Sequence, residues 1–139
     1  MRQGPFPNIV QQSDAALNDS DKTFTVPAGK AWRLQMLMAS LISTATVGNR
    51  QIKVVIGDGT NILWSKNFGA VQAASLTRQY FGAADLPNDA AFDADGNIRM
   101  ALYQWVLPPG YTVRVYDSAA IAAAADDMTV RLLVEEMTE

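Results

Sequence analysis

The stretch T-V-P-A-G-K-A-W-R-L at residues 25–34 has a counterpart in V-L-P-P-G-Y-T-V-R-V at residues 106–115. Both stretches place a glycine two residues after a proline, and both continue into an alternating run with arginine between two apolar residues. Proline fixes φ and removes a hydrogen-bond donor, while glycine readily adopts the positive φ that many tight turns need. We therefore predict strand, Pro-x-Gly turn and strand at each stretch. The predicted turn residues are Pro27, Gly29, Pro108, Pro109 and Gly110.

Alternation of apolar and polar residues, which is typical of half-buried strands, recurs along the chain. Gly57-Asp58-Gly59-Thr60-Asn61 lies between two alternating segments and predicts a hairpin. The predicted strands are residues 22–26, 31–43, 50–56, 62–68, 76–81, 97–107, 111–117 and 128–136. This pattern predicts an all-β fold, a jelly-roll-like sandwich of about eight antiparallel strands, with a seven-stranded immunoglobulin-like sandwich as the alternative.

The two longest predicted strands also predict which side chains face the core. In residues 31–43 the alternation assigns one face to Trp32, Leu34, Met36 and Met38. In residues 97–107 it assigns one face to Ile98, Met100, Leu102 and Val106, and the other to Tyr103, Trp105 and Leu107. Both of these faces cannot point at a single core. The second face is therefore expected to be covered by a loop, by another subunit or by a ligand.

The first residues differ in character from the rest of the chain. Pro5, Pro7 and the polar residues 11–14 disfavour regular structure, which predicts an extended N-terminal arm over residues 1–21 and a sandwich domain over residues 22–139. The apolar side chains in this arm are Phe6, Ile9 and Val10. We expect them to contact either the body of the same chain or a neighbouring subunit.

Composition excludes several classes of function. Apolar residues make up 49% and charged residues 18% of the chain, as in globular proteins, and no apolar run approaches the length of a membrane span. The net charge is −3 and the basic residues are scattered, which argues against direct nucleic-acid binding. With no histidine, metal-binding cupin sites and Ser-His nucleophiles are excluded. We expect no enzyme activity, no cofactor and no metal.

Two acidic motifs could suggest metal sites. Residues 93–97 (D-A-D-G-N) place oxygen ligands at alternate positions, as calcium loops do. An EF-hand loop would continue with glycine where Ile98 stands and with an acidic residue where Gln104 stands. An Asp-Gly turn that precedes a strand is therefore the favoured interpretation. Asp126-Asp127 is likewise predicted to be a solvated turn.

Three segments together resemble the tailed-bacteriophage capsid cement, or head-decoration, proteins of the jelly-roll type. They are Pro27-Ala28-Gly29-Lys30, Leu107-Pro108-Pro109-Gly110-Tyr111, and the tail from Val115-Tyr116-Asp117 to Asp126-Asp127-Met128. The resemblance spans about residues 22–136. It implies a structural virion protein, made in the bacterial cytoplasm, that binds the major capsid protein on the capsid exterior. Such a protein holds neighbouring capsomers together against internal DNA pressure.

For that role we expect a homo-oligomer, with a dimer favoured over a trimer, and no membrane contact. The candidate interface residues are Phe6, Ile9, Val10, Tyr103 and Trp105. The alternative is a phage fibre, tail or head–tail joining sandwich protein, including one that binds a glycan or a receptor.

Overall fold

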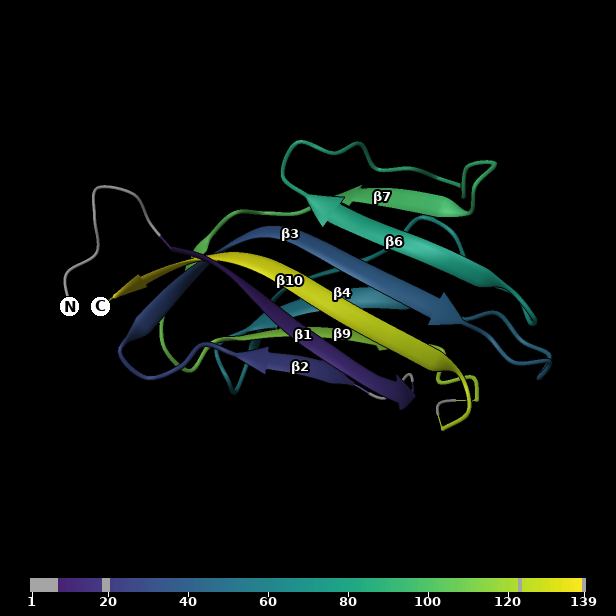
Figure 1. Cartoon of the computed structure of the whole chain (residues 1–139), viewed down its shortest axis with the longest axis horizontal. Coiled ribbons are helices and arrows are strands. Elements are labelled where there is room, and N and C mark those ends of the chain that lie inside the picture. Colours follow the sequence, from purple (N-terminus) through teal and green to yellow (C-terminus); the bar gives the residue numbers. More distant parts are fainter. Residues whose placement is uncertain (1–7, 19–20, 123, 139) are drawn as a thin grey trace.

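The computed structural model describes residues 8–18, 21–122 and 124–138, which contain ten strands and no helix (Figure 1). The first sheet has the spatial order β1 (Asn8–Asn18), β10 (Asp127–Thr138), β3 (Lys30–Ile42), β6 (Thr77–Ala83) and β7 (Asn97–Ala101), with β8 (Val106–Leu107) also paired to β3. The second sheet has the order β2 (Lys22–Thr25), β9 (Thr112–Asp117), β4 (Ile52–Gly57) and β5 (Ile62–Asn67). The predicted β-sandwich is confirmed, with more strands than expected.

The connections also fit a jelly-roll-like sandwich. Most of them cross from one sheet to the other, as Greek-key connections do. One pair departs from the predicted antiparallel arrangement, because β6 and β7 are parallel. The long loop between those two strands gives the chain room to return to the same end of the sheet.

The core lies between the two sheets and follows the predicted alternation in most strands. On β4 and β10 the predicted inward residues are fully buried: Ile52, Val54, Ile56, Met128, Val130, Leu132 and Val134. Removing each of these aliphatic side chains from water contributes about 1.5–3 kcal/mol. Together they supply much of the apolar contact between the two sheets.

The Pro-x-Gly turns have the same geometry. In residues 27–30 and 108–111 the last amide donates a hydrogen bond to the proline carbonyl oxygen, at 3.2 Å in both. Gly29 has φ +74° and Gly110 has φ +86°, the left-handed conformation that glycine accepts without strain. Each turn carries the chain from one sheet to the other.

The two turns also lie side by side. The Val26 amide donates to the Tyr111 carbonyl oxygen at 2.9 Å, and the Gly110 amide donates to the Val26 carbonyl oxygen at 2.9 Å. On either side of this contact, β2 pairs with β9 and β3 pairs with β8. The repeated sequence therefore marks two equivalent corners that form one end of the sandwich.

The predicted inward face of β3 is wrong beyond its middle. A bulge lies where Leu133 and Val134 of β10 pair with Met36 and Leu34, so that Gln35 is the extra residue. An extra residue in one strand shifts every later side chain to the opposite face. The buried residues are accordingly Trp32, Leu34, Leu37, Ala39 and Leu41, while Met36 and Met38 are half-buried on the outer face.

The predicted strand over residues 97–107 is interrupted. β7 pairs with β6 and ends at Ala101, and β8 begins at Val106 against β3. The chain changes its neighbour between these strands, and the alternation restarts: Leu107 is buried and Val106 is 47% exposed, the reverse of the prediction. Tyr103 and Trp105 therefore lie in a connection and are not on the second face of a strand.

The expectation of irregular structure is wrong for residues 8–18. This segment is strand β1, which pairs with β10 in unbroken antiparallel register from Asn8 to Asp14, before a bulge that ends at Asn18. Its partner is thus the body of its own chain. Phe6 lies outside the described residues, and the division into an arm (1–21) and a sandwich (22–139) stays a prediction.

Lys22 fixes the bulge of β1. Its side chain is 1% exposed, and its ammonium group donates to the Ala16 carbonyl oxygen at 2.7 Å and to Asn18 Oδ1 at 3.1 Å. Asp14 Oδ1 lies 3.5 Å from the same nitrogen. A buried ammonium group needs such partners, so β2 of the second sheet holds the end of β1 in the first.

Candidate functional site

The acidic motifs are structural. Asp93 Oδ1 accepts hydrogen bonds from the amides of Asp95 and Asn97, both at 2.9 Å, which is the geometry of the predicted Asp-Gly turn. In the part of the chain that the structure describes, no group of three or more His, Cys, Asp or Glu side chains could hold a metal ion. The same residues contain no helix that is long and apolar enough to cross a membrane.

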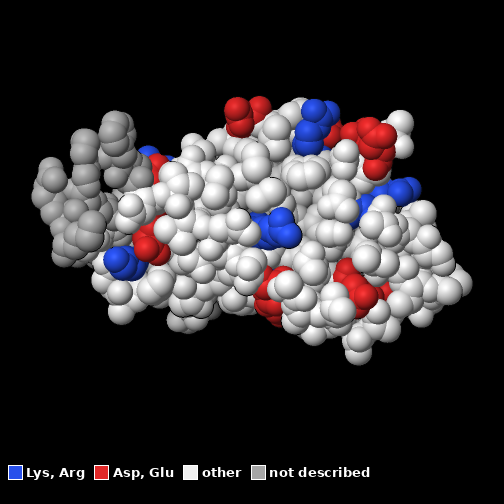
Figure 2. Space-filling view, in the orientation of Figure 1, with Lys and Arg blue, Asp and Glu red and all other residues white. Residues whose placement is uncertain are grey.

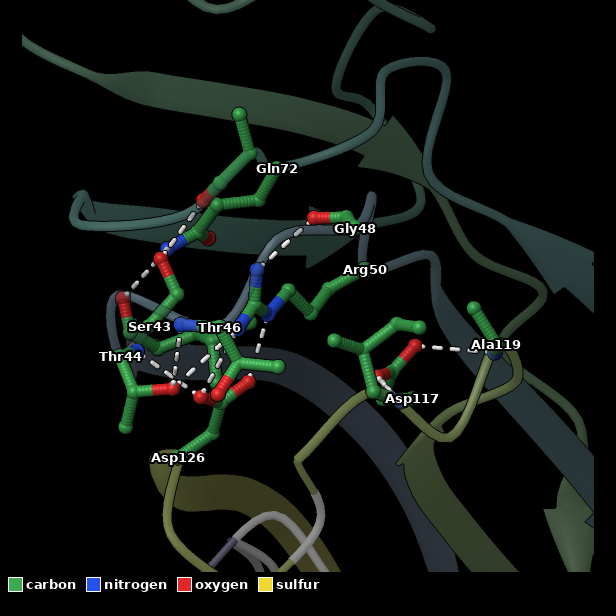
Figure 3. Close-up of polar contacts among 12 residues, drawn as sticks. Ser43, Thr44, Thr46, Gly48, Arg50, Gln72, Asp117, Ala119 and Asp126 are labelled. Carbon is green, nitrogen blue, oxygen red and sulfur yellow. Dashed lines mark hydrogen bonds and ion pairs between the residues drawn. The ribbon is translucent and has the colours of Figure 1, made fainter.

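The prediction of a solvated turn is wrong for Asp126. Asp126 forms a buried ion pair with Arg50, and both side chains are fully buried (Figure 3). Arg50 Nε lies 2.7 Å from Asp126 Oδ2, and Arg50 Nη2 lies 3.2 Å from Oδ1. The remaining groups are also used, since Arg50 Nη1 donates to the Gly48 carbonyl oxygen and the Thr44 amide donates to Asp126.

A second buried polar group adjoins this pair. Gln72 exchanges two backbone hydrogen bonds of 2.8 Å with Arg50, and its side-chain amide donates to the carbonyl oxygens of Leu41 and Leu76, each at 3.0 Å. The Tyr80 hydroxyl donates to Gln72 Oε1 at 2.7 Å. These hydrogen bonds fasten three connecting loops to the sandwich, and the network is closed to solvent.

The shifted pKa values agree with structural roles. Burial would raise the pKa of Asp126, but hydrogen bonds from Arg50 and Thr44 outweigh it and lower that pKa. The pKa of Asp58 is lowered by amide hydrogen bonds from the hairpin turn, and that of Asp89 by Arg99. All three carboxylates are therefore held ionised as hydrogen-bond acceptors. None has the raised pKa of a general acid.

Two exposed aromatic side chains and one partly buried one gather at one edge of the sandwich. Tyr103 and Trp105 are 57% and 38% exposed, and their rings stack with centroids 5.2 Å apart. Trp64 of β5 meets Tyr103 edge-on at 5.9 Å. We call these three residues the aromatic patch. Large aromatic side chains of this kind are the usual anchors of protein interfaces.

A hollow of about 550 Å³ adjoins the aromatic patch. Its lining includes Trp64, Tyr103, Lys66, Asn88 and Gln104. Lys66 Nζ donates to Asn88 Oδ1 at 2.5 Å, so the polar side chains of one wall are held in place. An aromatic wall beside fixed polar groups can stack on an apolar or planar ligand surface and hydrogen-bond to its edge.

Ile9 of β1 and Val106, the neighbour of Trp105 in the chain, lie on the same face of the first sheet. Ile9 pairs with Glu135, Glu135 with Arg33, and Arg33 with Val106. This outer row ends in two exposed apolar side chains, Ile9 (54%) and Val106 (47%). Between them Arg33 and Glu135 form an ion pair of 3.6 Å.

The remaining candidates are Phe6, which lies outside the described residues, and Val10. Val10 is half-buried and packs against the core, so its side chain points away from Ile9. Sequence reasoning missed Trp64 and the outer row, because the pairing of distant strands leaves no signal in the local sequence. Figure 2 shows scattered single charges and no basic patch on the face it displays.

No protein-family model and no curated protein sequence matches this chain. Similar solved structures include one of turnip yellow mosaic virus, with 12% identity and a TM-score of 0.36, covering 100% of this chain and 85% of that chain. One of Desmodium yellow mottle tymovirus has 13% identity, a TM-score of 0.33 and coverages of 100% and 91%. One of infectious bursal disease virus has 8% identity, a TM-score of 0.35 and coverages of 97% and 36%.

Proposed function

We propose that this chain is a structural virion protein that binds the exterior of a tailed-phage capsid and cements neighbouring capsomers. The observation that carries the proposal is the clustering of surface anchors, the aromatic patch and the outer row, on a sandwich whose buried Arg50–Asp126 ion pair is used internally. The proposal also rests on the sequence resemblance to cement proteins. In this role the chain acts without catalysis or a cofactor, and its surface is the working part.

The physical basis of cementing is repetition. Each copy needs only a modest contact, because many copies around a symmetric shell act together and a homo-oligomer engages more than one site at once. Tyr and Trp suit such contacts, since they bury a large apolar area with few rotatable bonds. The partner we propose is the major capsid protein, and self-association of the chain supplies the second contact.

Binding to capsid shells tests this function. We expect Tyr103→Ala/Trp105→Ala to weaken binding about thirtyfold, since interface anchors contribute about 2 kcal/mol or more. The matched control is Val47→Ala, because Val47 is 90% exposed and follows the far end of β3. Hundreds of copies per virion support the cement role. A dozen or fewer, or unchanged binding by the double variant, contradicts it.

A second candidate function is glycan or receptor binding by a fibre or tail protein. The hollow beside the aromatic patch favours it, because the volume of about 550 Å³ and the fixed Lys66–Asn88 pair suit a small polar ligand with an apolar face. Calorimetry with host surface glycans separates the two functions. Saturable binding that Trp64→Ala abolishes, in a protein that does not bind capsid shells, supports the second candidate.

A further inference from the structure

Strand β1 forms one edge of the six-stranded sheet. β10 lies on one side of it, and among the described residues no strand pairs with its other side. The regular stretch from Asn8 to Asp14 pairs with seven successive residues of β10. The outer backbone groups of this stretch are a template for another extended chain.

The opposite edge of the same sheet is closed by its own chain. The Asp89 amide donates to the Arg99 carbonyl oxygen at 2.9 Å, and the Arg99 amide donates to Asp89 Oδ2 at 3.0 Å. Asn88 Oδ1 accepts from the Ala101 amide at 3.1 Å. The loop before β7 thus occupies the outward groups of that strand, and nothing equivalent is described along β1.

The sequence of β1 lacks the residues that usually keep an edge unpaired. Lys, Arg and Pro are absent from Asn8–Asp14, and Asp14 is its only charge. The edges of the other sheet differ, because β2 has four residues and β5 carries Lys66. Natural proteins block exposed edges with charges, prolines or short strands, so the unblocked stretch of β1 points to a pairing surface.

We propose that β1 pairs antiparallel with β1 of a second copy, about a two-fold axis at Gln11. Directly opposed residues in a sheet lie on the same face. In an antiparallel pair of identical strands related by a two-fold axis, one residue must therefore lie directly opposite the same residue of the second copy. When the two-fold axis passes at Gln11, all seven residues from Asn8 to Asp14 pair with the second copy. This register places Ile9 opposite Ser13 and Asn8 opposite Asp14 of the second copy.

The charge pattern favours a second copy and this register. Moving the centre to Asp14 would place two carboxylates directly opposite each other, which is destabilising. Moving the centre toward Asn8 reduces the number of paired residues. The bulge after Asp14, held by Lys22, ends the regular stretch and limits the pairing to it.

The inference rests on the self-association included in the proposed function, but not on capsid binding. It is therefore tested on the purified full chain without capsids. We expect wild type to be a dimer in sedimentation and light-scattering measurements at micromolar concentration. Gln11→Lys and Gln11→Glu are each expected to be monomers, because like charges then face each other, while an equimolar mixture of the two regains the dimer.

Thr60→Lys is the control for added charge, since Thr60 is exposed at the hairpin tip between β4 and β5. It is expected to remain a dimer. Gln11 is exposed, so the fold of its variants is expected to persist, and circular dichroism checks it. A monomeric wild type, or a dimer that Gln11→Lys leaves intact, overturns the proposal, the latter in favour of another interface such as the aromatic patch.

Single cysteines test the register, because the chain has no cysteine of its own. Directly opposed strand residues have Cα atoms about 4.5–5.5 Å apart, within reach of a disulfide. Under mild oxidation Gln11→Cys is expected to cross-link with itself, and Ser13→Cys only in a mixture with Ile9→Cys. Efficient self-cross-linking of Ser13→Cys would overturn this register.

Capsid binding separates this inference from the proposed function. A dimer with the predicted cross-links that fails to bind shells would remove the cement role and leave the pairing. A monomer that decorates shells would remove the pairing and leave capsid binding. Cross-linking of Gln11→Cys to a capsid strand, and not to its own copy, would identify a different occupant of the edge and overturn the inference.

Discussion

The Arg50–Asp126 ion pair is a contact that is costly to break from one side. Both side chains are fully buried and hydrogen-bonded. Taking two charges out of water is unfavourable, and mutual attraction with added hydrogen bonds offsets that cost only while both partners are present. The pair therefore joins the loop after β3 to the loop before β10, and its loss releases both.

We predict that Asp126→Ala lowers the free energy of unfolding by about 3–5 kcal/mol, because it leaves the Arg50 guanidinium buried without its carboxylate. Urea denaturation measures the change. The neighbouring Asp127→Ala is the control, since Asp127 is only half-buried, and we expect at most about 1 kcal/mol for it. Equal effects at both positions would contradict the role assigned to the ion pair.

Asp126 also makes stability depend on pH. Its pKa in the folded chain lies below the ordinary value of 3.8, because the hydrogen bonds of Arg50 and Thr44 outweigh burial. The unfolded chain therefore takes up this proton at a higher pH than the folded one. The stabilisation is complete above the unfolded pKa and is lost as the pH falls through the folded pKa.

We predict that the urea midpoint of wild type falls more steeply between about pH 5 and about pH 3 than that of Asp126→Asn. The variant keeps its other carboxylates, including Asp58 and Asp89, so it controls for their titration. Parallel pH profiles of the two proteins would show that Asp126 does not titrate differently in the folded chain.

Substitutions at the two turn glycines, Gly29 and Gly110, measure the cost of a left-handed backbone conformation without a steric clash. Gly29 and Gly110 have positive φ, and an added Cβ would meet no heavy atom within 4 Å. We predict that Gly29→Ala or Gly110→Ala lowers the free energy of unfolding by about 1–2 kcal/mol, through the left-handed backbone alone. Gly29→Asn is expected to cost less, because asparagine tolerates this conformation. An equal loss for Ala and Asn would point to another cause.

At the scale of strands, the sequence predicts where the strands lie better than which of their side chains point into the core. The inward residues of β4 and β10 were predictable from their alternation, although Val55 of β4, an outward position by that pattern, is buried as well. In β3 the extra residue Gln35 reverses the alternation, and an inserted residue with a polar side chain looks like any other outward position. The break between β7 and β8 was missed for a similar reason, because a change of pairing partner has no local signature.

We predict that deleting Gln35 is tolerated better than deleting Met38. Removing the bulge residue leaves Leu34 inward, Met36 outward and Leu37 inward, so the ladder with β10 becomes regular. Deleting Met38 turns Ala39 and Leu41 away from the core. Thermal unfolding of the two deletion variants measures the difference, and a lower midpoint for the Gln35 deletion would contradict the bulge assignment.

For the whole molecule, the repeated Pro-x-Gly sequence was the most informative feature. It predicted both corners, and the structure brings them into contact. The sequence left open whether this N-terminal segment contacts its own body or a neighbouring subunit, because the anchor of β1, Lys22, looks like an ordinary surface lysine. The aromatic patch was predicted in part: Tyr103 and Trp105 were candidates, while Trp64 comes from a strand of the other sheet.

We predict that Lys22→Met lowers stability only when β1 is present. In the full chain the lysine is paired, and its loss is expected to lower stability. In a chain lacking residues 1–20 the ammonium group loses Asp14, Ala16 and Asn18 and is open to water, so Lys22→Met is expected to have little effect there. Denaturation of the four proteins measures this cycle, and destabilisation in both backgrounds would contradict it.

The loop that closes the β7 edge also limits how many further chains can add to this sheet. A sheet with two free edges can add chains without limit, as fibrils do. In this sheet the hydrogen bonds of Asn88 and Asp89 take up the outward groups at the β7 end. Strand addition is thereby confined to one edge of this sheet, which favours a closed pair of chains over a filament.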